Sequence, residues 1–250
     1  MQYRVFETAE SACVQVAAEM AWLIRERAIL SRAAVFGLTT GKSTLPLYQE
    51  LIYLHREEGL SFSNVITFNL DEYLGLEANH PSSSRSFMQR EFFDHVDISS
   101  QSIHFLSGLT PDSDTPALCS AYEHQIAAVG GIDYQILGIG RNGHIGFNEP
   151  GTPMNARTRM VELHAPTRSS MACKFGGIEN VPTRALTMGC GTILEARNIA
   201  LLAWGARKNK VVKRTLNEPI SSKTCASYLQ THRAARVYLD VPAGLILGRT

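Results

Sequence analysis

The stretch AAVFGLTTGKSTLPLYQELIYL, residues 33–54, decides the fold. Its first six residues form a short apolar run whose length and flanks predict a buried strand. A turn rich in glycine and hydroxyl groups follows. Leucines then recur at helical spacing behind Pro46, which a helix tolerates in its first turn. Strand, turn and helix in this order are the unit from which parallel α/β sheets are built.

The same alternation extends over the rest of the chain. Apolar residues at helical spacing predict helices at 9–30, 85–95, 116–129 and 206–216. Further strands are predicted at 65–70, 134–139, 185–188, 199–204 and 236–240. This order predicts an α/β fold with an open, mostly parallel sheet and helices on both faces, in which ligands gather at the carboxyl ends of strands. We find no repeat and no convincing linker, so residues 1–250 are expected to form a single domain.

Composition and charge exclude several classes of protein. The net charge is +1, and Lys and Arg are scattered along the chain, which argues against nucleic acid or an anionic membrane as a partner. The N-terminus lacks an unbroken apolar core of the kind found in signal peptides, and no later run approaches a membrane span, so we expect a cytoplasmic protein. The cysteines are odd in number and widely spaced, and we expect them to be reduced core residues rather than bridges or metal ligands: Cys13, Cys119, Cys173, Cys190 and Cys225.

The turn in the opening stretch is a candidate phosphate site. It reads GLTTGKST over residues 37–44. Free N–H groups and the dipole of the helix that follows favour a phosphate there. The turn resembles a Walker A loop, but Gly37 and Gly41 enclose three positions where that loop needs four. An alternative remains open, because such residues also cap helices without any ligand.

A second candidate element is VITFNLDEY, residues 65–73, an apolar strand that ends in two acids. Because adjacent strand residues point to opposite faces, we expect only one of Asp71 and Glu72 to enter a site. The pattern also fits a Walker B strand, which keeps a nucleotide hydrolase open, or an acid that caps the next turn.

The third element, LGIGRNGHIGFNEPG at residues 137–151, concentrates the most chemistry. Glycine allows backbone to approach a ligand or to adopt positive φ, and histidine suits acid and base work near neutral pH. His144, with Asn142 and Glu149 beside it after a strand, therefore predicts an active-site loop rather than a turn with one exposed histidine.

Two further segments are more ambiguous. LTMGCGTILEA, residues 186–196, either lines a cleft with backbone or makes a tight strand-to-helix turn. Lys208 follows the apolar run 199–204 and either meets a phosphate or belongs to a solvated face. Together the elements indicate proton transfer on a small phosphorylated metabolite. A nucleophilic serine is not indicated, because no GxSxG elbow occurs.

These segments, with HPSSSRSFM at residues 80–88, resemble the glucosamine-6-phosphate deaminase family over roughly residues 35–232, and the order and spacing of the motifs agree. The resemblance implies a Rossmann-like core and chemistry without a metal or organic cofactor. It also implies conversion of glucosamine 6-phosphate and water to fructose 6-phosphate and ammonia.

By the same resemblance, Asp71 removes the C2 proton and returns it to C1, His144 opens the pyranose ring, and Glu149 orients the imidazole. Many members have Asp at the position of Asn142, the fourth residue of this relay. Because Asn carries no negative charge, we expect ring opening to depend more heavily on Glu149.

The resemblance also implies a set of substrate-binding residues. They are Thr40, Gly41, Lys42, Ser43, Thr44, Gly140, Lys174 and Lys208. Lys174 stands near the place of an arginine expected from the family, and as a point charge it would lack bidentate geometry.

Other parts of the chain bear on regulation. Some relatives are hexamers activated by N-acetylglucosamine 6-phosphate. The chain departs from them at Met160-Val161-Glu162 and by ending at Thr250, which predicts hyperbolic kinetics indifferent to that effector. Residues 158–184, with Gly176 and Gly177, are expected to act as a lid. A monomer and a homo-oligomer both remain open.

Three alternative functions are weighed against the deaminase. A 6-phosphogluconolactonase-type hydrolase shares the fold but has no need of an enolising base in FNLDEY. A non-catalytic sugar-phosphate sensor fits less well, because the full acid and base set is present without a helix-turn-helix extension. A P-loop hydrolase is disfavoured by the loop length.

Overall fold

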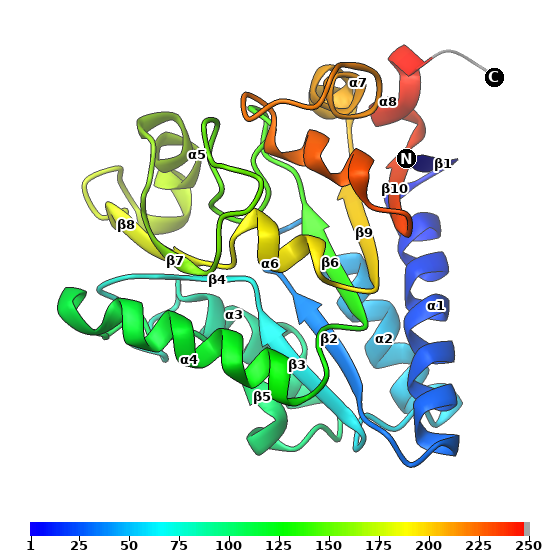
Figure 1. Ribbon diagram of the computed structural model, residues 1–250. Helices are drawn as coiled ribbons and strands as arrows, with labels where there is room; N and C mark the ends of the chain where they lie inside the picture. Colours follow the sequence, from blue (N-terminus) through cyan, green and yellow to red (C-terminus); the bar gives the residue numbers. More distant parts are fainter. Residues whose placement is uncertain (248–250) are drawn as a thin grey trace.

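The central sheet of the computed structural model, which describes residues 1–247, has seven strands that all run parallel (Figure 1). This confirms the α/β class and the open, mostly parallel, Rossmann-like sheet. Thr250 lies outside the described residues. In spatial order the strands are β1 (Gln2–Phe6), β10 (Ala235–Asp240), β9 (Asn198–Ala203), β6 (Tyr134–Gly138), β2 (Ala34–Leu38), β3 (Val65–Asn69) and β5 (Ile103–His104).

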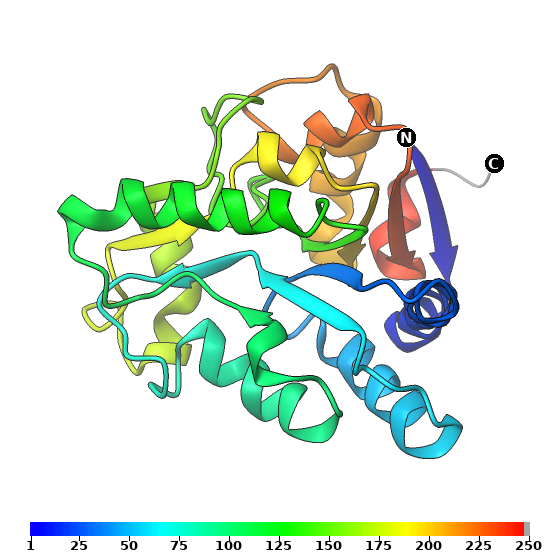
Figure 2. The ribbon, with the colours of Figure 1, turned by 60° about the horizontal axis from the view of Figure 1, so that its bottom comes forward.

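Helices cover both faces of this sheet, as the alternation predicted (Figure 2). Along β2, Phe36 and Leu38 pack into a core with α1 (Ala9–Ile29), α2 (Leu45–Glu58) and α3 (Ser84–Glu91). Val35 points the other way, into a core with α4 (Thr115–Ala128), α6 (Cys190–Leu194) and α7 (Asn209–Asn217). Successive strand residues therefore supply two separate cores, which is why the buried strands read as continuous apolar runs.

A second, antiparallel sheet was not predicted. It has the order β4 (Asp71–Tyr73), β8 (Arg184–Thr187) and β7 (Arg159–Glu162). The strand predicted at 185–188 belongs here and not to the parallel sheet, which corrects the sequence interpretation. Leu70 joins the two sheets, because its N–H donates to Leu38 O (2.7 Å) and its carbonyl accepts from Met188 N (2.9 Å). The chain thus passes directly from β3 into the small sheet, and Asp71 is its first residue there.

The order of the strands locates the crevice of the fold. From β2 the chain moves outward through β3 and β5, and it then returns to the other side of β2 as β6. The loops that leave β2 and β6 therefore diverge at this point, where open α/β sheets bind their ligands. These loops are residues 39–44 and 139–151, the first and third candidate elements. No helix within residues 1–247 combines the length and the apolar character needed to cross a membrane.

The cysteines follow the prediction with one exception. Cys13, Cys119, Cys190 and Cys225 are buried thiols, whereas Cys173 is exposed. Cys173 lies on α5 (Ala165–Phe175), a helix that buries only one of its eleven residues. Its expected place in the core was wrong because α5 has almost no core-facing side.

Candidate active site

The loop after β2 is a tight turn over the end of the sheet. Gly41 has φ +124°, and its carbonyl accepts from both Thr44 N (3.1 Å) and Thr44 Oγ1 (2.9 Å). Thr44 is fully buried, so its hydroxyl shapes the turn. Thr40, Gly41 and Ser43 are half-buried and Lys42 is exposed, which leaves them accessible to a ligand. No side chain caps the N-terminus of α2, so its first-turn amides are also open to an anion.

This loop lies against the ends of β6 and β9. The indole of Trp204, just beyond β9, donates to Ser43 O (2.8 Å). Lys208 Nζ donates to Ile139 O (2.5 Å), directly after β6. Burial, and next the positive charge of Arg141, lower the pKa of Lys208. The structure therefore brings Lys208 to the same strand ends as the candidate phosphate loop, as the sequence predicted.

The loop after β6 is folded around the imidazole of His144. Gly140 N donates to His144 O (2.9 Å), and Gly143 N donates to Gly140 O (3.0 Å) with φ +93° at Gly143. A Cβ at Gly140 would overlap the His144 ring. Glycine is therefore required at position 140 because the imidazole lies against its backbone; its predicted contact with substrate stays a prediction.

Asn142, His144 and Glu149 converge, as predicted. Asn142 Nδ2 donates to Glu149 Oε2 (2.7 Å), and Asn142 Oδ1 accepts from His144 N (3.2 Å). Glu149 Oε2 lies 3.5 Å from His144 Nδ1, which has no hydrogen-bond partner among residues 1–247. Burial alone would raise the pKa of Glu149, but contacts with His144, Thr167 and Asn142 outweigh it and lower that pKa to about 2. Glu149 is thus an anion beside the imidazole.

The two acids that follow β3 have different environments. Glu72 accepts backbone N–H bonds from Tyr73 (2.8 Å), Ser84 (2.9 Å) and Arg85 (3.0 Å), so it caps the N-terminus of α3. The carboxylate of Asp71, only 7% exposed as a residue, accepts no backbone N–H within residues 1–247 and has the hydroxyl of Ser84 beside it. One acid is used structurally and the other is left for a ligand, which agrees with the expectation that only one enters the site.

The environment of Asp71 also changes its proton affinity. Burial raises its pKa to about 7, the Glu72 carboxylate adds to the rise, and the ammonium of Lys174 opposes it. A carboxyl group with a pKa near the working pH can both accept and return a proton. Asp71 therefore has the property that a base shuttling a proton needs.

Strand β8 connects Asp71 to the His144 loop. Thr187 is the Cα partner of Asp71, and its Oγ1 accepts from Phe147 N (3.2 Å). One residue later, Met188 O accepts from Asn148 Nδ2 (2.8 Å). The turn after β8 packs tightly, since a Cβ at Gly189 would overlap the backbone of Ala156. Of the two interpretations of residues 186–196, these contacts favour the tight turn, which serves as a scaffold.

Lys174 does not contact the candidate phosphate loop, where the sequence suggested that it would act. Its Nζ donates to Ser82 O (3.0 Å) and lies 5.5 Å from the centre of the Tyr73 ring. Within the described residues no hydrogen bond joins it to the loop at 39–44. Lys174 is thus a neighbour of Asp71 in this structure, and its binding of phosphate stays a prediction that these contacts do not support.

Sequence reasoning missed Thr167, whose hydroxyl donates to Glu149 Oε1. It also missed Thr187 and Trp204, which hold the two site loops. Thr167 carries no signal in the sequence, because its helix lacks apolar periodicity. The two other residues lie at the ends of predicted strands, where a position at the carboxyl edge is the one available clue.

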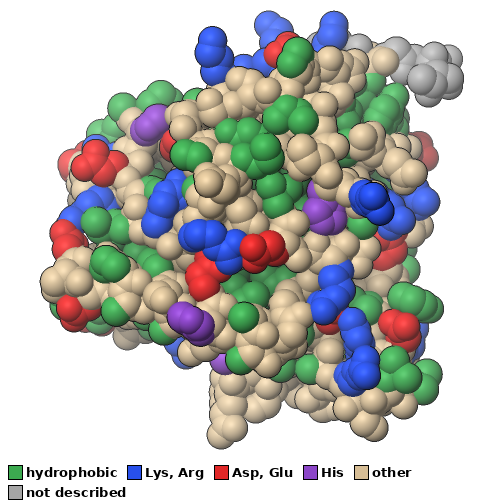
Figure 3. Space-filling model, viewed as in Figure 1, with side chains coloured by type: hydrophobic (Ala, Val, Ile, Leu, Met, Phe, Trp, Pro, Cys, Tyr) green, Lys and Arg blue, Asp and Glu red, His purple; other side chains and the backbone are tan. Residues whose placement is uncertain are grey.

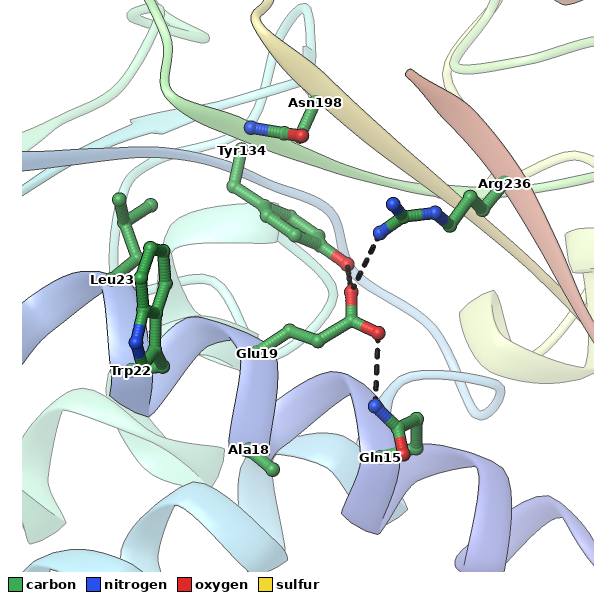
Figure 4. A pocket seen from close by; sticks show the side chains of 8 residues that line it. All are labelled: Gln15, Ala18, Glu19, Trp22, Leu23, Tyr134, Asn198 and Arg236. Carbon is green, nitrogen blue, oxygen red and sulfur yellow. Dashed lines mark hydrogen bonds and ion pairs between the residues drawn. The ribbon is translucent and has the colours of Figure 1, made fainter.

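The surface and the cavity outside this site have fewer features of an active site. On the face in Figure 3, Lys and Arg are interspersed with Asp and Glu and with apolar side chains. A cavity of about 410 Å³ lies between α1 and the amino ends of β6, β9 and β10 (Figure 4). There Glu19 accepts from Tyr134 OH (2.7 Å) and Gln15 Nε2 (3.0 Å), with Arg236 at 3.6 Å. This carboxylate joins α1 to the sheet, at the opposite end from the candidate site.

Comparison with known proteins gives a consistent picture. Residues 6–238 match the family described as glucosamine-6-phosphate isomerases/6-phosphogluconolactonase. Glucosamine-6-phosphate deaminase 1 of Giardia intestinalis is 43% identical over 96% of this chain and 90% of its own. The solved structure of a monomeric glucosamine-6-phosphate deaminase superposes with a TM-score of 0.93 at 40% identity, covering 98% of this chain and all of that one. A 6-phosphogluconolactonase from Trypanosoma brucei, at 18% identity and a TM-score of 0.79 over 99% and 98% of the two chains, shares the fold alone.

Proposed function

The chain belongs to the glucosamine-6-phosphate isomerase/6-phosphogluconolactonase family, and we infer that it is an enzyme converting glucosamine 6-phosphate and water to fructose 6-phosphate and ammonia. One observation carries this inference most directly. Asp71 is a buried carboxyl group with a pKa near neutrality that caps no helix, and it is attached through one strand to the loop that holds His144 and Glu149.

The first step proposed is ring opening by His144. The imidazole takes the proton of the C1 hydroxyl and delivers one to the ring oxygen, so that the C1–O5 bond breaks and an open-chain aldehyde forms. Glu149, ionised at neutral pH, stabilises the imidazolium formed in passing and fixes the plane of the ring. Asn142 supports Glu149 by hydrogen bonding and adds no charge of its own.

The second step proposed is proton transfer by Asp71. The carboxylate removes the C2 proton as the C1 oxygen takes a proton from water, which gives an enolamine. Asp71 then returns its proton to C1, and the double bond moves to C2 and nitrogen. Water adds to this C2 imine and ammonia leaves, so that C2 becomes the ketone of fructose 6-phosphate. A pKa of about 7 supports both the removal and the return of the proton.

The phosphate of the substrate is assigned to the loop after β2. Backbone and hydroxyl groups of Thr40, Gly41 and Ser43, the first-turn amides of α2, and the ammonium groups of Lys42 and Lys208 are the donors proposed. Both Lys208 and this loop lie at the strand ends beside Gly140, which supports their acting on one ligand.

Several broader properties belong to the same proposal. We place the reaction in the cytoplasm, in the degradation of N-acetylglucosamine, as hydrolysis of a C–N bond. Residues 1–250 are proposed as one domain with a lid at 158–184, a range that contains β7 and α5 and ends at Arg184, the first residue of β8. The departures at Met160 and Glu162 support an enzyme indifferent to N-acetylglucosamine 6-phosphate.

The test is an ammonia-release assay on purified protein with glucosamine 6-phosphate, run beside Asp71→Asn and with 6-phosphogluconolactone as a second substrate. The proposal expects equimolar ammonia and fructose 6-phosphate from the wild type and neither from the variant. Lactone hydrolysis without ammonia would favour the lactonase-type alternative. Binding of the sugar phosphate without turnover of either substrate would favour a sensor.

A further inference from the structure

Helix α5 buries very little of its surface against the rest of the molecule. Of its eleven residues only Thr167 is buried. A buried hydroxyl must find a hydrogen-bond partner, and that of Thr167 donates to Glu149 Oε1, across eighteen residues of sequence. The one buried side chain of α5 therefore ends on a carboxylate of the candidate active site, while Phe175, at the end of the helix, packs against Tyr73.

The two oxygens of Glu149 are held by different elements. Oε1 is bound from α5 by Thr167, and Oε2 is bound by Asn142 from the loop after β6. With both ends fixed, Oε2 is directed to the imidazole of His144, 3.5 Å away. Without the bond from α5 the carboxylate would be free to rotate about its terminal torsion, which is broad for Glu.

The other groups that face Glu149 do not replace this bond. His164 Nδ1, at the start of α5, lies 3.9 Å from Oε2, beyond hydrogen-bond distance. The thiol of Cys225 donates to the backbone carbonyl of Glu149 (3.3 Å) and not to the carboxylate. Asn142 is neutral, so Glu149 is the carboxylate that faces His144 in this relay. Within residues 1–247, the side chains that hydrogen-bond to this carboxylate are Thr167 and Asn142.

The same helix reaches the other half of the site. Lys174, seven residues after Thr167, is two helical turns further along the same face. There it bonds to Ser82 O beside Asp71, whose pKa its charge lowers. Helix α5 therefore contributes to the surroundings of both Glu149 and Asp71.

Resting on the proposed function, we propose that Thr167 is a positioning residue whose hydroxyl aligns Glu149 with His144 only while α5 is docked. Ring opening is then tied to the position of α5, and undocking that helix leaves His144 without an oriented carboxylate.

The experiment compares Thr167→Val with Thr167→Ser, and with Ser169→Val as a control on the exposed face of α5. Thr167→Val keeps the shape and removes the hydroxyl. We expect its kcat to fall about tenfold, the scale of a lost hydrogen bond to a charged group, with KM changed less than about twofold. The ring-nitrogen NMR signals of His144 should shift in the same variant. Thr167→Ser should restore both, and Ser169→Val should match the wild type.

Unchanged His144 signals in folded Thr167→Val, or a kcat within about twofold of the wild type, would overturn the inference. Equal losses in Thr167→Ser and Thr167→Val would also overturn it, because the hydroxyl would then not matter. If the wild type releases no ammonia, the proposed function is refuted, but the inference about Thr167 is not. The His144 signals then decide the role of Thr167 independently.

Discussion

Asp71 and Thr187 are direct partners across the antiparallel pair β4 and β8. The Thr187 hydroxyl accepts the N–H of Phe147, three residues after His144. A single threonine therefore fixes the candidate base relative to the loop that carries the imidazole. Catalytic groups need such rigid support, because a displacement of about 1 Å can cost roughly 100-fold in rate.

Thr187→Val tests this connection. The residue is fully buried, so the substitution leaves the Phe147 N–H without a partner. We expect the free energy of unfolding to fall by about 1–3 kcal/mol, measured by urea denaturation, together with a lower kcat. Unchanged stability and activity would show that the two parts of the site are held together by other contacts.

Asn142→Asp should alter the pH dependence of turnover without abolishing it. Asn142 donates to Glu149 Oε2 at 2.7 Å, and an ionised Asp cannot. The second carboxylate would repel Glu149, raise the pKa of Glu149 above its present value of about 2, and stabilise the protonated imidazole. A pH profile of kcat measures the effect. Complete loss of activity in a folded variant would refute this division of roles.

Lys174→Ala and Lys208→Ala should have different kinetic effects, the first on the pH profile and the second on KM. The charge of Lys174 lowers the pKa of Asp71, so its removal raises that pKa above about 7 and moves the acid limb of kcat/KM to higher pH. Lys208 lies at the candidate phosphate loop, so its removal should raise KM. A raised KM and an unshifted pH profile for Lys174→Ala would restore its predicted role at the phosphate.

Asp71→Asn should stabilise the fold at alkaline pH. Burial raises the pKa of Asp71 from its ordinary value of 3.8 to about 7, so between these values the folded state binds more protons than the unfolded state. Stability then falls as pH rises from about 4 to 7. Asn removes the buried charge and should gain up to about 4 kcal/mol at pH 8, with little change at pH 4. Urea denaturation at both pH values measures this; equal stability at pH 8 would contradict the cause assigned to the shift.

Local patterns were sufficient to predict most of the parallel sheet. The run at 33–38 became β2, Ala34–Leu38, and the helix behind Pro46 became α2, Leu45–Glu58. Such helices and strands bury a whole face, so their apolar residues recur at a regular spacing in the sequence. Edge strand β1, Gln2–Phe6, has no buried residue and was missed for that reason.

Features that depend on distant partners could not be predicted in the same way. The run at 185–188 reads as a buried strand in either sheet, and only its pairing with β4 decides which. Strand geometry left the choice between Asp71 and Glu72 open, and only the family resemblance favoured Asp71, because the choice depends on the N-terminus of α3, which takes the Glu72 carboxylate. Thr167 had no signal at all, since it is the one buried residue of α5 and a single position leaves no apolar period.

In the proposed reaction, Asp71 moves a proton between C2 and C1 of glucosamine 6-phosphate. The most direct measurement is the initial rate of ammonia release by the wild type, Asp71→Asn and Glu72→Gln, each shown to be folded. We expect Asp71→Asn to lose activity at least about 1000-fold and Glu72→Gln, at the helix cap, to stay within about tenfold of the wild type. Ammonia release by Asp71→Asn at a rate near that of the wild type would contradict the claim.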